Sequence, residues 1–159
     1  MFIRERMRRV ARHCSVVVVA PVAWFPMNSL VRGSLWAGIP GREQQGDLPV
    51  YHPRFVCVPR YVKWLDGLLY ACSLIPFLAR LRRDFPFDLI DAHFAYPDGV
   101  AAALLGRVFK RPVVITLRGS LVRLARYPMH RPQIRAALSA AARVLSVSDS
   151  LRQIALTLG

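Results

Sequence analysis

Polar side chains follow two of the predicted strands, at the point where each strand ends. His93 comes directly after Asp88–Ala92, and the triplet Arg118-Gly119-Ser120 follows Pro112–Leu117. Histidine can accept or donate a proton near neutral pH. Arginine presents a fixed fork of N–H donors that suits phosphate and sugar oxygens. Because ligands of open α/β sheets bind beyond the carboxyl ends of the strands, the pattern predicts a ligand site there.

Each of these residues also has a structural interpretation. His93 can hydrogen-bond a carbonyl at the end of its own strand, and Arg118 can be a surface arginine in a turn. Their position at strand ends favours ligand contact, so we assign His93 and Arg118 as catalytic. Gly119 lets the backbone approach a ligand, and Ser120 adds a hydroxyl, so both are predicted to bind substrate.

Two further substrate-binding candidates carry stronger structural alternatives. Asp98 opens a predicted helix, where a capping role is favoured. Trp24 can stack on a sugar or a lipid, or be buried at a sheet edge. The remaining histidines lack partners at a useful spacing and are assigned to the surface or to packing. Because no metal-ligand spacing, phosphate-binding loop, nucleophile elbow or nucleic-acid motif occurs, we expect no metal and no nucleic-acid partner.

Predicted strands and helices alternate along the 159 residues, of which 54% are hydrophobic. This pattern predicts an α/β fold with a Rossmann-like, open, mostly parallel sheet and helices on both faces. The segment Pro21–Pro49 is predicted to be a long loop. Strands are predicted at Ser15–Ala20, Val50–Val58 with a break at Pro53, Asp88–Ala92, Pro112–Leu117 and Arg143–Val147. Helices are predicted at Met1–His13, Arg60–Arg83 with a kink or a split at Pro76, Asp98–Lys110, His130–Ala142 and Asp149–Leu158.

The chain is strongly basic, with 23 Lys and Arg against nine Asp and Glu and a net charge of +14. Such a charge predicts anionic partners. Arginines crowd the first predicted helix and end the helix before Asp84, so we expect peripheral binding to the anionic cytoplasmic face of the cell membrane. The apolar run Gly67–Ala79 is too short to span a bilayer, and no transmembrane segment is predicted. Three cysteines without a CxxC motif predict no disulfide and a reducing, cytoplasmic compartment.

Four segments resemble the N-terminal half of a bacterial family-4 glycosyltransferase of the GT-B class: Val16–Pro26, Tyr51–Arg60, Phe87–Ser120 and Ala141–Gly159. The specific part is DAHFAYPDG followed by PVVITLRGS. The resemblance implies two Rossmann-like domains that face a cleft. The N-terminal domain holds a saccharide or lipid-linked acceptor, and the C-terminal domain holds the nucleotide-sugar donor. It also implies transfer with retained anomeric configuration, without metal or other cofactor, in polysaccharide biosynthesis.

The same resemblance suggests roles and boundaries. His93 matches a cleft-facing position of the family. Arg118-Gly119 lies where many relatives have His-Gly and a subset has Arg-Gly. Relatives with Arg-Gly often have an Asp at the position where this chain has Leu121. The family begins with a strand and a glycine-rich loop, whereas this chain begins at a helix. We therefore expect residues 1–159 to be the acceptor-side domain without its first strand and without the donor domain, and to be inactive alone. A non-catalytic Rossmann-like binding module and a gene remnant stay open as alternatives.

Overall fold

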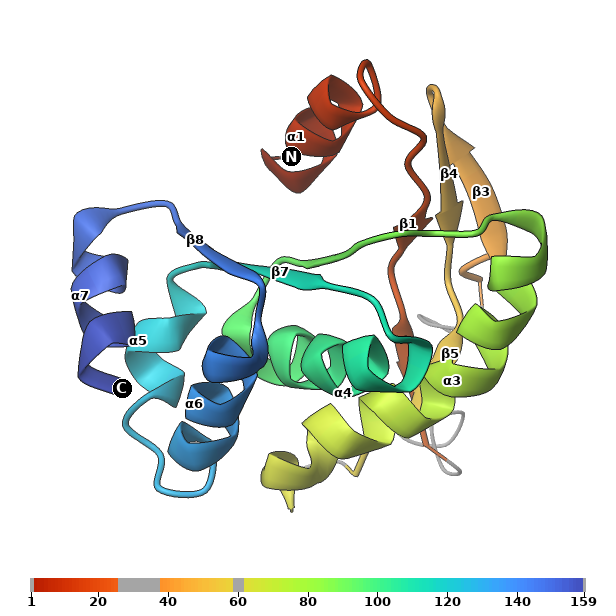
Figure 1. Cartoon of the computed structure of the whole chain (residues 1–159). Coiled ribbons are helices and arrows are strands. Elements are labelled where there is room, and N and C mark those ends of the chain that lie inside the picture. The colour runs from red at the N-terminus through yellow and green to blue at the C-terminus, as the bar shows by residue number, and fades with distance from the viewer. Residues whose placement is uncertain (1, 26–37, 59–61, 159) are drawn as a thin grey trace. The chain divides into compact units, whose positions relative to one another are not determined.

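The structure is a computed structural model that describes residues 2–25, 38–58 and 62–158. The chain divides into two compact units, Met1–Cys57 and Val58–Gly159, and each is described by itself. The fold is α/β with mostly parallel strand pairs, as predicted (Figure 1). All three cysteines are free, in agreement with the sequence.

The described residues of the first unit form one amphipathic helix and five short strands. Helix α1 (Phe2–Val10) buries Met7 and carries its arginines on the remaining surface. Strand β1 (Val18–Val19) pairs in parallel with β4 (Leu48–Tyr51), and β2 (Val22–Trp24) pairs in parallel with β5 (Arg54–Val56). The predicted strand Ser15–Ala20 is thus shorter than expected, and extended backbone resumes beyond Pro21.

Part of the predicted loop Pro21–Pro49 is regular structure. Strand β3 (Arg42–Gln45) forms an antiparallel hairpin with β4, and Gly46 at the turn has a φ of +66°, which favours glycine. The loop prediction was therefore wrong for this stretch, because Arg42–Gln45 is polar throughout and lacks the apolar alternation that identifies a strand. Residues 26–37 of the predicted loop lie outside the described residues.

The hairpin brings His52 and Glu43 together, which the spacing in sequence did not suggest. The His52 Nε2 atom lies 3.2 Å from Glu43 Oε1, and Nδ1 lies 2.9 Å from the Ala20 carbonyl oxygen. A hydrogen bond from Gln45 and the contact with His52 lower the pKa of the Glu43 carboxyl. His52 therefore links the hairpin to the end of β1, rather than lying free on the surface.

The second unit is a parallel three-stranded sheet with helices, in the order β6-β7-β8. Helix α4 (Val100–Phe109) packs against β6 and β7, and α6 (Arg131–Ala140) packs against α4. Every element predicted for this unit is present. The bounds are η1 Lys63–Leu65, α3 Asp66–Asp84, β6 Ile90–Ala92, η2 Ala95–Gly99, β7 Val113–Leu117, α5 Ser120–Leu124, β8 Arg143–Ser146 and α7 Asp149–Leu158.

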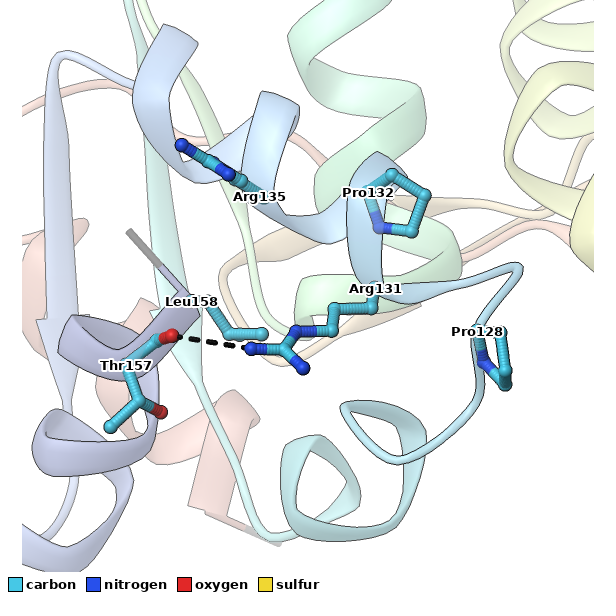
Figure 2. A pocket seen from close by; sticks show the side chains of 6 residues that line it. All are labelled: Pro128, Arg131, Pro132, Arg135, Thr157 and Leu158. Carbon is cyan, nitrogen blue, oxygen red and sulfur yellow. Dashed lines mark hydrogen bonds between the residues drawn. The ribbon is translucent and has the colours of Figure 1, made fainter.

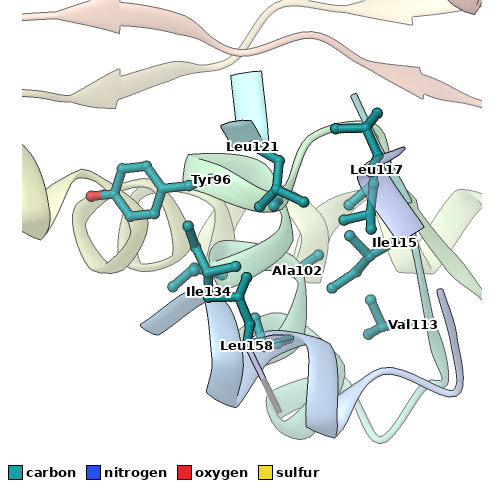
Figure 3. Close-up of a cluster of buried hydrophobic side chains, with 14 residues drawn as sticks. Tyr96, Ala102, Val113, Ile115, Leu117, Leu121, Ile134 and Leu158 are labelled. Atoms are coloured by element: carbon teal, nitrogen blue, oxygen red, sulfur yellow. The ribbon is translucent and has the colours of Figure 1, made fainter. Parts of the chain in front are cut away.

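The core of this unit lies between the sheet and its helices (Figure 3). Ile115 and Leu117 of β7, Leu121 of α5 and Ile134 of α6 are completely buried. Burying a side chain of this size stabilises the fold by about 1.5–3 kcal/mol. Gly106 lets α4 approach the sheet, because a Cβ there would lie 2.4 Å from Val113 Cγ2. This packing fixes where β6 and β7 end.

Helix α3 is continuous through Pro76, so the proline does not split it into two helices. The segment Lys63–Asp84 is long and apolar enough to cross a membrane by length and composition alone, with a mean hydropathy of 1.3 and a third of the window buried. The length argument from Gly67–Ala79 was therefore wrong, since the helix continues beyond that run at both ends. One face of α3 packs against α4, with Ala71, Leu74 and Leu78 buried.

Candidate functional site

Strands β6 and β7 bring the two predicted catalytic residues to one edge of the sheet. The strands are parallel, with Ala92 opposite Ile115. His93 directly follows β6, and Arg118 directly follows β7. The carboxyl ends of neighbouring parallel strands lie at the same end of the sheet. His93 and Arg118 therefore follow neighbouring strand ends, as expected from the sequence.

His93 lies close to an acidic residue that the sequence analysis treated only as part of a strand. The His93 side chain is 13% exposed, and its Nε2 atom lies 3.9 Å from Asp91 Oδ2. Residues two apart in an extended segment project to the same side, so the period of a strand could have predicted this pair.

Arg118 and Ser120 lie where β7 turns into α5. The Arg118 guanidinium carbon lies 5.9 Å from the centroid of the Phe94 ring, close enough for a cation–π contact. The Ser120 hydroxyl oxygen is buried and has no hydrogen-bond partner among the residues that the structure describes. Gly119 precedes α5 in a right-handed helical conformation, and a Cβ added there would meet nothing within 4 Å. Open space therefore borders this turn.

Asp98 is held by a neighbouring side chain and does not cap a helix. The Tyr70 hydroxyl donates a hydrogen bond of 3.2 Å to Asp98 Oδ1, and the start of α4 has no side-chain cap. Burial raises the pKa of the Asp98 carboxyl, and burial together with the Asp98 charge raises the pKa of Tyr70. The capping interpretation was therefore wrong, and the carboxyl instead connects η2 to α3.

Tyr96 fixes the segment between His93 and α4. Its hydroxyl accepts a hydrogen bond of 3.2 Å from the Gly67 N–H and donates one to the Lys63 carbonyl. Its ring packs edge-on against His130, with 4.6 Å between centroids. Burial lowers the pKa of His130, which makes it a packing residue, as predicted. Gly99 lets the two ends of this segment approach closely, because a Cβ there would lie 2.8 Å from the Phe94 carbonyl oxygen.

Trp24 belongs to the first unit, where it ends β2 with 44% of its surface exposed. The interpretation as a residue buried at a sheet edge was therefore wrong for this side chain. An exposed indole leaves the stacking role possible for an apolar or sugar surface.

A pocket of about 340 Å3 lies in the second unit, between α6 and α7, and none of the predicted site residues lines it (Figure 2). Arg131 and Arg135 make its lining basic, and the Arg131 side chain donates a hydrogen bond of 3.5 Å to the Thr157 carbonyl oxygen. Among the described residues, no group of three or more His, Cys, Asp or Glu could hold a metal ion.

Fold and site together define a Rossmann-like α/β domain with polar residues at the carboxyl edge of a parallel sheet. The family described as Glycosyltransferase Family 4 matches residues 2–159, and the chain belongs to this family. It is 35% identical over 118 residues to a Bacillus subtilis (strain 168) protein named "Putative teichuronic acid biosynthesis glycosyltransferase TuaC". The match covers 72% of this chain and 30% of that relative, so the chain spans about a third of the relative's length.

Proposed function

We propose that this chain is the acceptor-side half of a retaining glycosyltransferase. Such an enzyme transfers a hexosyl group from a nucleotide-sugar to a saccharide or lipid-linked acceptor in polysaccharide biosynthesis. Membership of family 4 supports glycosyl transfer in general. The relative's name supports a role in making a cell polysaccharide. The donor, the acceptor, the retained configuration and the absence of a metal or other cofactor belong to the proposal.

The observation that carries the proposal is the position of His93 and Arg118, which directly follow the carboxyl ends of adjacent parallel strands. The Arg118 guanidinium presents a fixed fork of N–H donors that can bind a phosphate or sugar oxygen. His93, beside Asp91, can hydrogen-bond an acceptor hydroxyl and orient it. Gly119 and Ser120 border the same turn and provide open space and a hydroxyl. Trp24 and Asp98 are the remaining substrate-binding candidates.

The proposal places the reacting sugar between this chain and a second, donor-binding domain. Transition-state stabilisation needs both sides of such a cleft. The 159-residue chain alone should therefore bind acceptor saccharides but transfer no sugar, and it should act in the cytoplasm, on the inner face of the membrane.

The test uses the 159-residue chain, with an acceptor saccharide titrated into the labelled protein while amide resonances are followed by NMR. Resonances around Arg118 and His93 should shift, and Arg118→Ala should weaken the binding by about tenfold or more. Arg135→Ala, which removes an arginine from the pocket between α6 and α7, is the matched control and should bind normally. Sugar turnover by the chain alone, or equal effects of the two variants, would contradict the proposal.

A further inference from the structure

Arg118 has a long side chain, and a substrate can use its guanidinium only in some orientations. The residue directly follows β7, at the turn into α5. Holding such a side chain in one conformation costs conformational entropy. A neighbouring group that fixes the guanidinium before a ligand arrives removes this cost from binding. The groups around Arg118 therefore decide how well it can bind.

Phe94 contacts this guanidinium with its ring. The Arg118 Cζ atom lies over the ring, 5.9 Å from its centroid, and the Arg118 Nε atom is buried. A positive charge within about 6 Å of a ring centroid is attracted by the ring face. Because a guanidinium is planar, one face can lie on an aromatic ring while its N–H groups point along the edges. The contact is therefore compatible with ligand binding by Arg118.

Phe94 is itself held against the strand that carries Arg118. Its backbone is extended, with φ −143° and ψ 151°, and its carbonyl oxygen accepts a hydrogen bond of 2.8 Å from the Gly99 N–H. Gly99 in turn lies so close to β7 that an added Cβ would be 3.2 Å from Ile115 Cγ2. Ile115 is completely buried and lies three residues before Arg118. The Phe94 backbone is therefore fixed relative to β7, and a fixed ring can orient a neighbouring side chain.

We propose that Phe94 is a positioning residue for Arg118. Its ring holds the guanidinium at the carboxyl end of β7, in the orientation in which a phosphate or sugar oxygen of the substrate meets the donor fork. Phe94 touches the arginine and not the substrate, so it acts through Arg118. The inference rests on the proposed substrate contact of Arg118, but the orientation of the guanidinium can be measured without a ligand.

A phenylalanine that only fills space has a different signature. A packing role depends on apolar volume, much of which leucine or methionine conserves. The positioning role depends on the ring face, which Phe94→Leu removes and Phe94→Tyr retains. Phe94→Met is a second variant without a ring, for the case that the leucine variant does not fold. Phe109→Leu is the matched control, because Phe109 of α4 is buried in the same unit and packs edge-on against Phe87.

The first measurement records the Arg118 Nε–H resonance of the isotope-labelled, 159-residue chain by NMR, without any ligand. The resonance is identified by its loss in Arg118→Ala. The ring current of Phe94 acts on protons that lie near its face, so Phe94→Leu and Phe94→Met should move the resonance toward that of an arginine in water. Phe94→Tyr and Phe109→Leu should leave it in place.

The second measurement titrates inorganic phosphate into the same chains at constant ionic strength and follows the amide resonances of Gly119 and Ser120. Phe94→Leu should raise the Kd by about tenfold, the size expected for a partly desolvated cation–π contact. Phe94→Tyr should raise it by less than about twofold. In a chain that also carries Arg118→Ala, Phe94→Leu should change the Kd by less than about twofold, because the contact is already absent.

The two proposals fail in different ways. The positioning role is overturned if the variants without a ring leave the Arg118 resonance in place, if Phe109→Leu moves it equally, or if Phe94→Leu weakens phosphate binding equally with and without Arg118. If phosphate leaves Gly119 and Ser120 unaffected in the unmodified chain, a phosphate oxygen does not bind at Arg118 as proposed, and the resonance measured without ligand decides the role of Phe94.

Discussion

A ligand-binding role for the turn at Gly119 can be tested by substituting two glycines that share a backbone conformation and differ in their surroundings. Gly119 has φ −54° and ψ −23°, and Gly99 has φ −64° and ψ −40°. Both are right-handed helical, so alanine is acceptable to either backbone. The difference between Gly119→Ala and Gly99→Ala therefore comes from what the new methyl group would meet.

The structure sets the expected energies for this pair. A Cβ at Gly119 meets nothing within 4 Å, so Gly119→Ala should change the free energy of unfolding by less than about 1 kcal/mol, in the stabilising direction. A Cβ at Gly99 lies 2.8 Å from the Phe94 carbonyl oxygen and 3.2 Å from Ile115 Cγ2. Overpacking of this kind costs about 1–3 kcal/mol.

The assay combines thermal unfolding with turnover of the proposed two-domain enzyme. For a chain of this size, each kcal/mol shifts the Tm by about 2–4 °C. Gly99→Ala should therefore lower the Tm by several degrees, while Gly119→Ala should keep it. Gly119→Ala should lower kcat/KM by about tenfold or more, because its methyl group occupies space that a bound substrate needs. Full activity of Gly119→Ala with an unchanged Tm would refute a ligand at this turn.

Three further outcomes follow from the packing around the site. Burial raises the pKa of Asp98, so the protonated carboxyl is favoured in the folded chain and its contribution to stability is lost as the pH rises through the raised pKa. Asp98→Asn should therefore stabilise the chain more at pH 7 than at pH 4 in urea unfolding. An equal gain at both pH values would contradict this. Gly106→Ala should lower the free energy of unfolding by about 1–3 kcal/mol through its clash with Val113, and an unchanged urea midpoint would show that α4 can move away. Because burial lowers the pKa of His130, its neutral form is favoured and stability should fall as the pH drops below about 6.5; His130→Gln should remove part of that fall, and an unaltered pH profile would count against it.

The sequence was most informative where β-branched runs meet clear breaks. Strand β7 could be predicted because a continuous apolar run is typical of parallel strands, and β6 and β8 could be predicted because they alternate with helices. The order of β6 and β7 placed His93 and Arg118 at the carboxyl ends of neighbouring strands. The hairpin of β3 and β4 could not be predicted from composition, since Arg42–Gln45 is polar and its partner contains a proline. Helix α5 was missed because five residues carry too little periodicity to identify a helix.

The side-chain pairs around the site depend on distances that a linear sequence does not contain. Tyr70 and Asp98 are far apart along the chain and meet only because α3 packs against η2 and α4. The pair of Asp91 and His93 could have been found from the two-residue period of a strand. The pair of His52 and Glu43 depends on a hairpin that was not predicted.

The most direct test of the account is steady-state glycosyl transfer by the proposed two-domain enzyme, compared for Arg118→Ala, Arg118→Lys and His93→Ala. With unchanged circular dichroism, Arg118→Ala should lower turnover by about 100-fold or more if the guanidinium meets charge that develops in the transition state. Arg118→Lys should rescue only part of the loss, because lysine lacks the planar fork, and His93→Ala should also lower turnover. If the folded variants keep activity close to that of the unmodified enzyme, His93 and Arg118 are packing and turn residues, and the proposed site is wrong.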